Sequence, residues 1–333
     1  MKVLCLAISR EYFLTSASDY TKAIAREHEV YTCYPDIVAT GLPNVKGHVP
    51  CNWHEFDFGP IKALQPDVIV TGNPRAAWNR APMLLLKMQG FPMVFAEYGW
   101  LPQRHHFYFD PVGLGNESIL TWVKTFNDKD VLKLHFDLQD AMNALHSLQQ
   151  GYYNPRPKLR NIPAGDYIFV PLQWEWDSSI IFDSSYFKSM DHLIAFAAFN
   201  FPEFPIVVKA HPLDKNRKRN CLLPNVSYVE PETDPIALIQ QSRAVFGINS
   251  TLLIEALVAE KPVAALGENV ASCRGVFYEG KDLYQNPRGL LEFKPDKKDI
   301  ALAINILLEW QILFSNPDMR KINRVLQLAI ELN

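Results

Sequence analysis

Polar segments that follow apolar runs carry most of the side chains in this chain that could do acid–base or phosphate chemistry. One of them is Lys209-Ala-His211-Pro212, which comes directly after the apolar residues 206–208. The apolar run predicts a buried strand, and Pro212 ends its pairing because proline has no backbone N–H. Lys209 and His211 are therefore expected at the carboxyl end of a strand, the edge where open α/β sheets bind ligands. Such a pair can hold a phosphate and help it leave, although a histidine that only bonds a loop is the plainer alternative.

Two further segments place carboxylates at strand ends. One is Glu97-Tyr98-Gly99 and the other is Gln173-Trp-Glu175-Trp-Asp177-Ser178. Glu97 could act as a general base, and Asp177 could attack an anomeric carbon or stabilise the charge that develops there. The plainer alternatives are that Glu97 is a solvated acid and that Asp177 or Ser178 only caps the next helix.

The two tryptophans of the second carboxylate segment, Trp174 and Trp176, could stack on a ligand or pack in the core. Packing is the expectation for at least one of them.

A fourth segment runs from a strand into a helix through Gly247-Ile-Asn249-Ser250-Thr251. Free N–H groups at the start of the helix, together with the hydroxyls, can bind an anion, and Glu255 further along could reach a ribose diol. A plain serine or threonine cap is the alternative for this segment taken alone. Taken jointly, the segments supply a base, a carboxylate and phosphate ligands, which indicates a nucleotide-sugar site.

Alternating apolar runs and helical patterns predict an α/β protein with two Rossmann-like domains that face each other across a cleft. The expected strands are Lys2–Ser9, Glu29–Tyr34, Asp67–Thr71, Pro92–Glu97, Tyr167–Pro171, Pro205–Lys209, Val226–Val229, Ala244–Gly247 and Pro262–Leu266. The expected helices are Ser18–Glu27, Phe58–Leu64, Ala81–Gln89, Asn127–Gln150, Tyr186–Phe199, Pro235–Gln241, Ser250–Val258, Ile300–Phe314 and Arg320–Leu332. Residues 100–120 are expected to form a long loop. No Gly-x-Gly-x-x-Gly follows the first strand, which disfavours the usual mode of NAD binding.

The proline-rich stretch 154–165 is the expected linker between the domains. It would divide an acceptor-side domain, 1–153, from a nucleotide-sugar-binding domain, 166–315. The helix within 316–333 could pack back on the first domain.

Composition restricts the classes of protein to consider. The chain has 333 residues, 48% of them hydrophobic and 21% charged, with a net charge of −3. This balance is typical of a globular protein and argues against general nucleic-acid binding, while a role for the basic run 215–219 stays open. Five cysteines without a Cys-x-x-Cys pair favour a reducing compartment. No signal peptide and no apolar run long enough to span a bilayer are recognised, so we expect a cytoplasmic protein that could attach to the inner face of the inner membrane.

No cofactor and no metal are expected, because no Asp-x-Asp stands where a sugar diphosphate would need it and no histidines have ligand spacing.

The motifs in this order resemble the GT-B glycosyltransferases that use CMP-activated ulosonic acids. The greater similarity is to the retaining β-Kdo transferases of bacterial capsule and O-antigen assembly, within the capsule polysaccharide biosynthesis protein family. Their Glu-Asp-Gly and Gly-Leu-Gly, Gln-x-Glu-x-Asp, Lys-x-His-Pro and Ser-x-x-x-x-Glu-Ala-Leu motifs resemble segments that start at residues 97, 113, 173, 209 and 250. Tyr98 stands where that family has its second acid.

The resemblance implies a CMP-Kdo donor, a surface-polysaccharide or glycolipid acceptor, and transfer with retention. Asp177 would then attack the anomeric carbon, and Glu97 would deprotonate the acceptor. His211 and Lys209 would bind the CMP phosphate together with Ser250 and Thr251, and Glu255 would hold the ribose. Gln173, Asn249, Gly99, Glu175 and Ser178 are the further candidate site residues.

Other readings stay open beside this one. They are another ulosonic acid or nucleotide donor, an inverting transferase of the CMP-sialic-acid type, a non-catalytic GT-B-like binding module, and a UDP-sugar epimerase.

Overall fold

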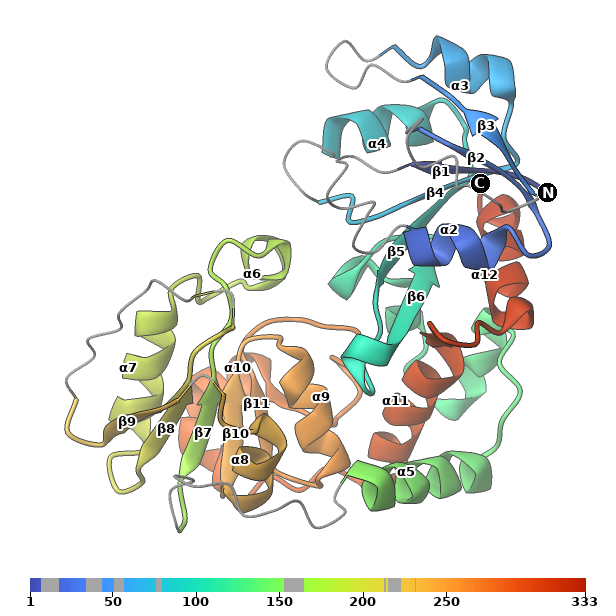
Figure 1. Ribbon diagram of the computed structural model, residues 1–333. Helices are drawn as coiled ribbons and strands as arrows, with labels where there is room; N and C mark the ends of the chain where they lie inside the picture. Colours follow the sequence, from blue (N-terminus) through green and yellow to red (C-terminus); the bar gives the residue numbers. More distant parts are fainter. Residues whose placement is uncertain are drawn as a thin grey trace. The chain divides into compact units, whose positions relative to one another are not determined.

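Two separate β-sheets form the frame of the chain, one in each of two structural units (Figure 1). The computed structural model describes residues 1–6, 18–33, 44–50, 57–75, 80–152, 165–212, 214, 223–230 and 232–333. The first unit comprises Met1–Ile119 and Leu307–Asn333, and the second unit comprises Leu120–Ile306. The domain limits expected from the sequence stay a prediction, and nearly all of the expected linker lies outside the described residues, as does the basic run 215–219. None of the described helices is both long and apolar enough to cross a membrane.

The first unit is built on a seven-stranded sheet in the order β13-β6-β5-β4-β1-β2-β3. Strands β1 to β5 pair in parallel, whereas β6 and β13 are antiparallel to their neighbours. The strands are β1 (Lys2–Leu6), β2 (Glu29–Thr32), β3 (Val45–His48), β4 (Val68–Thr71), β5 (Met93–Tyr98), β6 (His106–Asp110) and β13 (Ile312–Leu313).

Helices cover both faces of this sheet. Helices α2 (Ser18–Ile24) and α12 (Met319–Glu331) lie on one face, and α3 (Gly59–Leu64) and α4 (Arg80–Met88) lie on the other (Figure 1). Helix α12 packs on β4, β5 and β6 and on α2. It is strongly amphipathic, with Ile322, Val325 and Leu326 buried and charged residues outward, as a helix that covers a sheet requires.

The segment 100–120, expected to be a loop, contains the strand β6, which pairs with β5. That expectation was wrong because the run His106-Phe-Tyr-Phe-Asp110 is aromatic, and aromatic residues favour strands. The helix expected over 300–314 also ends earlier than predicted. Helix α11 (Lys297–Trp310) stops at Trp310, and β13 then pairs with β6.

Asp110, at the end of β6, is fully buried and ties together the loop that follows it. Its carboxylate accepts hydrogen bonds from the backbone N–H groups of Val112 (2.8 Å), Gly113 (3.0 Å) and Ile119 (3.1 Å), and from the hydroxyl of Ser118. Burial raises the pKa of this carboxyl to about 6, although the hydrogen bonds from Ser118 and the three N–H groups oppose the shift. One acceptor therefore satisfies four donors in a place that water does not reach.

Replacing Asp110 with alanine is expected to lower the free energy of unfolding by about 3–5 kcal/mol, because it leaves buried donors without a partner. Urea denaturation would measure the loss. Asp128 offers a matched control, since it also accepts bonds from two backbone N–H groups and a hydroxyl, but on the surface. Asp128→Ala should cost far less, because water replaces the lost acceptor. Equal losses for the two variants would contradict the importance of burial at Asp110.

The second unit is built on a six-stranded sheet in the order β12-β11-β10-β7-β8-β9, in which every pairing is parallel. Its strands are β7 (Ile168–Pro171), β8 (Ile206–Lys209), β9 (Val226–Val229), β10 (Ala244–Gly247), β11 (Val263–Ala265) and β12 (Tyr278–Glu279). The chain moves outward from β7 to β9 and then returns to the other side of β7 with β10. This reversal makes the sheet doubly wound, with its switch point between β7 and β10.

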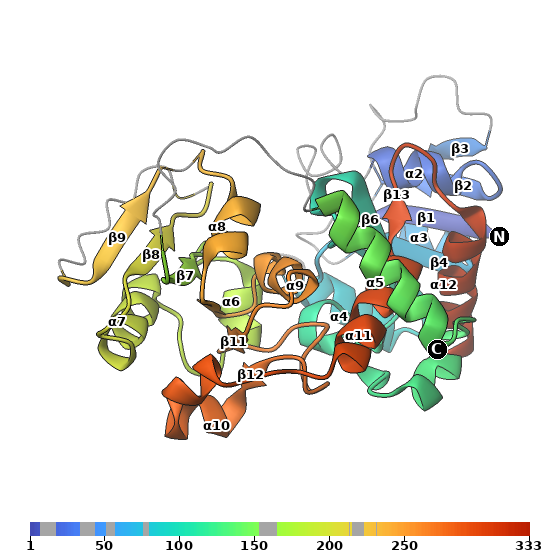
Figure 2. The same ribbon diagram turned by 90° about the horizontal axis from the view of Figure 1, so that it is seen from below.

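The central strands of this sheet are apolar without alternation because both faces are covered. One face, with Ile168, Val170 and Phe246, packs against α7 (Met190–Asn200) and the α10 region (Gly280–Gln285). On the other face, α8 (Pro235–Gln241) contacts β7, and α9 (Thr251–Val258) contacts β10 and β11. Figure 2 shows α7 and α8 on opposite faces.

The remaining helices of the second unit are short or lie beside α9. A 3₁₀ helix (Phe126–Leu132) and α5 (Leu138–Tyr152) occupy the region expected as a partly broken helix over 127–150. Helix α5 packs on α9, and the Gln149 side chain donates a hydrogen bond to the carbonyl of Val258 (3.0 Å). Helix α6 (Ser178–Asp183) follows β7 directly.

Candidate functional site

The candidate residues of the second unit gather at the carboxyl ends of β7, β8 and β10. Strand β7 ends at Pro171 and leads into the segment with Gln173 and Asp177, and β10 ends at Gly247 before Asn249. These two strands flank the switch point of the sheet, where open α/β sheets bind ligands. The topology therefore places the predicted site residues at the sheet edge where doubly wound folds bind ligands.

Gln173 and Asn249 hold the two sides of the switch point together. The side-chain amide of Gln173 donates to the Asn249 side-chain oxygen (2.8 Å) and accepts from the Asn249 backbone N–H (3.1 Å). Asn249 also donates to the carbonyl of Ser179 in α6 (2.9 Å). Both side chains are buried. This geometry makes them supports of the site, and their contact with a nucleotide stays a prediction.

Asp177 is exposed and caps α6. Its Oδ1 atom accepts a hydrogen bond from the backbone N–H of Ser179 (2.8 Å), and its own N–H donates to the carbonyl of Trp174 (2.9 Å). The capping role that the sequence offered as an alternative is therefore present. It does not exclude chemistry, because a carboxylate has a second oxygen and the cap fixes the direction of the group. Ser178 is the first residue of the helix that Asp177 caps.

Glu175 holds the same segment from another side. Its Oε1 atom accepts a hydrogen bond from the backbone N–H of Met190 (2.7 Å), at the start of α7. A negative charge at a helix N-terminus is stabilising, so this contact anchors the segment to α7. The structure thus gives Glu175 a positioning role.

Lys209 and His211 follow β8, the neighbour of β7. Only 6% of Lys209 is exposed, and burial lowers its pKa while the charges of Glu232 and Asp234 oppose the shift. Burial also lowers the pKa of His211, against the opposing charges of Asp177 and Asp214, and the charge of Lys209 adds to the decrease. The influence of Asp177 shows that the carboxylate and the imidazole lie close enough to interact.

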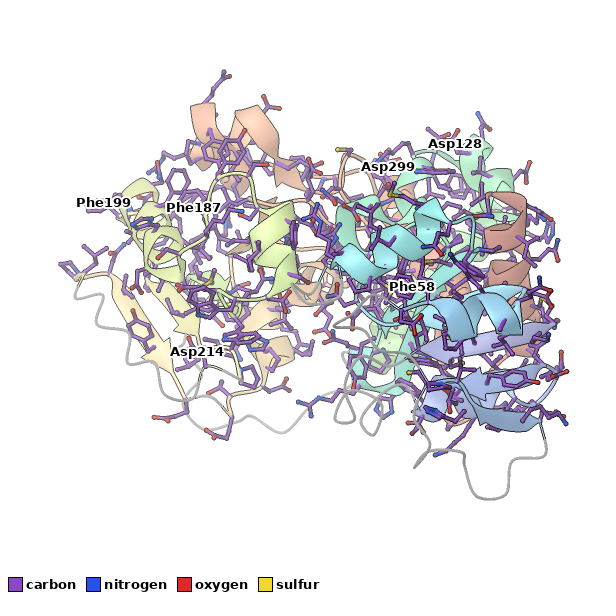
Figure 3. The ribbon with its side chains drawn as sticks, turned by 90° about the horizontal axis from the view of Figure 1, so that it is seen from above. Phe58, Asp128, Phe187, Phe199, Asp214 and Asp299 are labelled. Atoms are coloured by element: carbon purple, nitrogen blue, oxygen red, sulfur yellow. The ribbon has the colours of Figure 1, made fainter. Side chains whose placement is uncertain are left out.

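The sequence did not single out Asp214, which also acts on His211 and lies just beyond the end of β8 (Figure 3). Its backbone N–H donates to the carbonyl of His211 (2.9 Å), which forms a turn. An aspartate three residues after the histidine, with Pro212 between them, is the signal that could have indicated it.

Ser250 caps α9 after β10, and its Oγ atom accepts from the backbone N–H of Leu252 (3.2 Å). Thr251 begins the helix and Glu255 lies about one turn further, both partly exposed. The expected serine cap is therefore present, and the positive end of the helix dipole points to the same sheet edge as Asp177 and His211.

Glu97 and Gly99 belong to the first unit. Glu97 lies at the end of β5 and accepts a hydrogen bond from the backbone N–H of Tyr98 (2.9 Å). A Cβ atom at Gly99 would come within 2.6 Å of the His106 Cβ, so no larger residue fits between β5 and β6 there. The packing of β5 against β6 is therefore enough to require glycine at position 99.

No cluster of three potential metal ligands occurs among the residues that the structure describes.

Residues 147–298 match the family model described as "Capsule polysaccharide biosynthesis protein". The match to this family model lies within the second unit. The family segment contains Asp177, His211 and every other candidate residue of the second unit, whereas Glu97 and Gly99 lie outside it.

Two curated proteins are similar to part of this chain. Protein FixF of Sinorhizobium fredii is 28% identical over 203 residues, which are 59% of this chain and 47% of FixF. The capsule polysaccharide export protein KpsS of Escherichia coli is 31% identical over 157 residues, 43% of this chain and 39% of KpsS. The matches thus cover less than half of the length of either relative.

A solved structure shows the fold of the whole chain. The β-Kdo 2,7 transferase of KpsC from Thermosulfurimonas dismutans matches with a TM-score of 0.60 at 19% identity, over 98% of this chain and 99% of that one. The fold class expected from the sequence, α/β with two Rossmann-like domains of the GT-B kind, is confirmed by this match and by the two sheets.

Proposed function

We propose that this chain is a glycosyltransferase that moves a keto-sugar, Kdo or a similar ulosonic acid, from a CMP-activated donor to a bacterial surface-polysaccharide acceptor. The observation that carries the proposal is the grouping of Asp177, His211, Lys209 and Ser250 at one sheet edge, inside the capsule polysaccharide biosynthesis segment. The likeness of the fold to a β-Kdo transferase supports the choice of donor.

The reaction would proceed in two steps with retention. A carboxylate oxygen of Asp177 attacks the anomeric carbon, the bond from that carbon to the phosphate oxygen breaks, and its electron pair leaves with CMP. The acceptor hydroxyl then attacks the same carbon, the bond to Asp177 breaks, and the electron pair returns to the carboxylate. A carboxylate nucleophile suits the oxocarbenium-like character of both transition states.

The remaining residues are assigned by the charge that each would meet. Lys209 and His211 would neutralise the departing phosphate, and the α9 N-terminus with Ser250 and Thr251 would bind its oxygens. Glu255 would bind the ribose. Glu97 would take the proton of the acceptor hydroxyl in the second step, and this role rests on the sequence motif.

One observation favours a second candidate function, an inverting transferase. The Asp177 carboxylate already caps α6, so a purely structural role would leave Glu97 as base and His211 as acid in a single displacement. In that case the product would have the opposite anomeric configuration.

The acceptor would be a glycan or a glycolipid, and we place the reaction in the cytoplasm, with peripheral attachment to the inner membrane where the acceptor is lipid-linked.

A thermal-shift titration with CMP, CDP, UMP and UDP tests the donor. A ligand at 100 times its Kd should stabilise the protein by roughly 2.7 kcal/mol. Selective stabilisation by CMP is expected, because the site offers one phosphate cluster and no Asp-x-Asp for a metal-bound diphosphate. Stabilisation by UDP in place of CMP would overturn the donor and, with it, the role of Asp177.

A further inference from the structure

Residues 173–177 alternate between anchored polar side chains and exposed tryptophans. Gln173, Glu175 and Asp177 each bond back to the scaffold, at Asn249, at the start of α7 and at the start of α6. Between them, Trp174 is 41% exposed and Trp176 is 72% exposed. Neither tryptophan lies in the core, and Trp174 is the more covered of the two.

The segment that carries the tryptophans is held in one conformation. Its three polar side chains fasten it to three different elements, and the hydrogen bond from the Asp177 N–H to the Trp174 carbonyl closes a turn between them. Trp176 thus stands on a braced turn directly beside Asp177. Because an indole has few rotatable bonds, a tryptophan on such a turn offers a large and rigid contact surface.

We propose that Trp176, with Trp174 beside it, is a stacking platform for a pyranose ring of the acceptor glycan. This rests on the proposed function, which places the reacting carbon at Asp177. One face of many pyranose rings carries only C–H groups, and an indole face can cover it. The donor phosphate has polar ligands in Lys209, His211 and Ser250, so the exposed aromatic surface is left for the acceptor.

The charges of the tryptophan-bearing segment itself disfavour an anionic membrane surface as the partner. Residues 173–187 contain the acids Glu175, Asp177 and Asp183 and not one lysine or arginine. The next cation, Lys188, donates to the carbonyls of Ile180 and Ile181 at the end of α6. Membrane-surface segments instead carry cations around their aromatic residues.

Phe199 provides a matched control. It lies near the end of α7 and is also 72% exposed, and it points away from its helix, whereas Phe187 packs against Phe196 (Figure 3). Phe199 belongs to no part of the proposed site. Phe199→Ala removes an equally exposed aromatic ring without touching the platform.

The first experiment observes Trp176 directly. The protein is labelled with 5-fluorotryptophan, its seven fluorine resonances are recorded, and Trp176→Phe identifies one of them. The probes are methyl β-galactopyranoside, methyl N-acetyl-β-glucosaminide and the methyl ketoside of Kdo, with mannitol as an open-chain control. A saturable shift of the Trp176 resonance with at least one pyranoside, and none with mannitol, is expected.

The second experiment is kinetic, with CMP-Kdo and the pyranoside that gives the largest shift. Trp176→Ala should raise the acceptor KM about five- to tenfold and change the donor KM less than twofold, while Phe199→Ala changes neither. A rise in the donor KM alone, or no rise at all, would overturn the proposal. The proposal would also be overturned if Trp176→Ala left the acceptor KM unchanged but sedimented less with vesicles of anionic phospholipid. That result would indicate that Trp176 binds a membrane.

Failure of this inference is distinguishable from failure of the proposed function. Stabilisation by CMP with no pyranoside shift at Trp176 would refute the platform and leave the transferase. A shift at Trp176 without stabilisation by CMP would keep a glycan site and refute the donor.

Discussion

Asp177→Asn is expected to lower kcat by about 10⁴-fold, with the fold and the binding of CMP unchanged. Loss of a covalent nucleophile removes the two-step route, and comparable losses accompany removal of nucleophilic residues in other enzymes. Asparagine is as good a helix cap as aspartate, so the substitution separates the chemical role from the capping role that Asp177 has in α6. Turnover with CMP-Kdo and thermal stabilisation by CMP would measure the two effects.

Asp318→Asn is the matched control, because Asp318 caps α12 in the first unit through the backbone N–H of Arg320 (2.9 Å). It should leave turnover unchanged. Intact-mass spectrometry of the wild-type enzyme during turnover should show a keto-sugar adduct that Asp177→Asn lacks. If Asp177→Asn instead keeps substantial activity, the result contradicts the covalent route and supports the inverting mechanism with Glu97 as base and His211 as acid.

The sequence was sufficient to predict the parallel strands at the centre of both sheets because these strands are covered on both faces. Val68–Thr71 and Ile206–Lys209 are buried throughout, and the first three residues of each are all apolar. Polar residues then mark the carboxyl ends of these strands. Since parallel strands end at one edge of a sheet, the Lys209 and Asp177 segments could be grouped before any coordinates were known.

Elements that depend on distant partners were missed. Strand β13 has only two residues and exists because it pairs with β6, about 200 positions earlier. Likewise, the hydrogen bonds between Gln173 and Asn249 follow from the adjacency of β7 and β10, which no local pattern encodes. The exposure of Trp176 was unpredictable for a similar reason, since it results from the anchoring of its two neighbours.

Lys209→Met is expected to lower kcat/KM by about 10²–10³-fold and to abolish stabilisation by CMP, because it removes the cation that we propose binds the leaving phosphate. The same substitution should not lower the free energy of unfolding. Burial lowers the pKa of Lys209 below its unfolded value, so burying this lysine costs stability at every pH below the unfolded pKa, including neutral pH. Methionine keeps the length of the chain without the charge, and the free energy of unfolding should stay within about 1 kcal/mol or rise.

Lys261 is the matched control for this substitution. Burial lowers its pKa as well, and its ammonium donates to the carbonyl of Ser242 (2.9 Å), before β10 begins, so it lies at the other edge of the sheet. Lys261→Met should leave CMP binding and turnover unchanged. The comparison of Lys209 with Lys261, at opposite edges of one sheet, thus separates the cost of burying a charge from the use of that charge in binding. If Lys209→Met still bound CMP like the wild type, the phosphate would have to rest on His211 and the α9 N-terminus, and Ser250 would become the next residue to test.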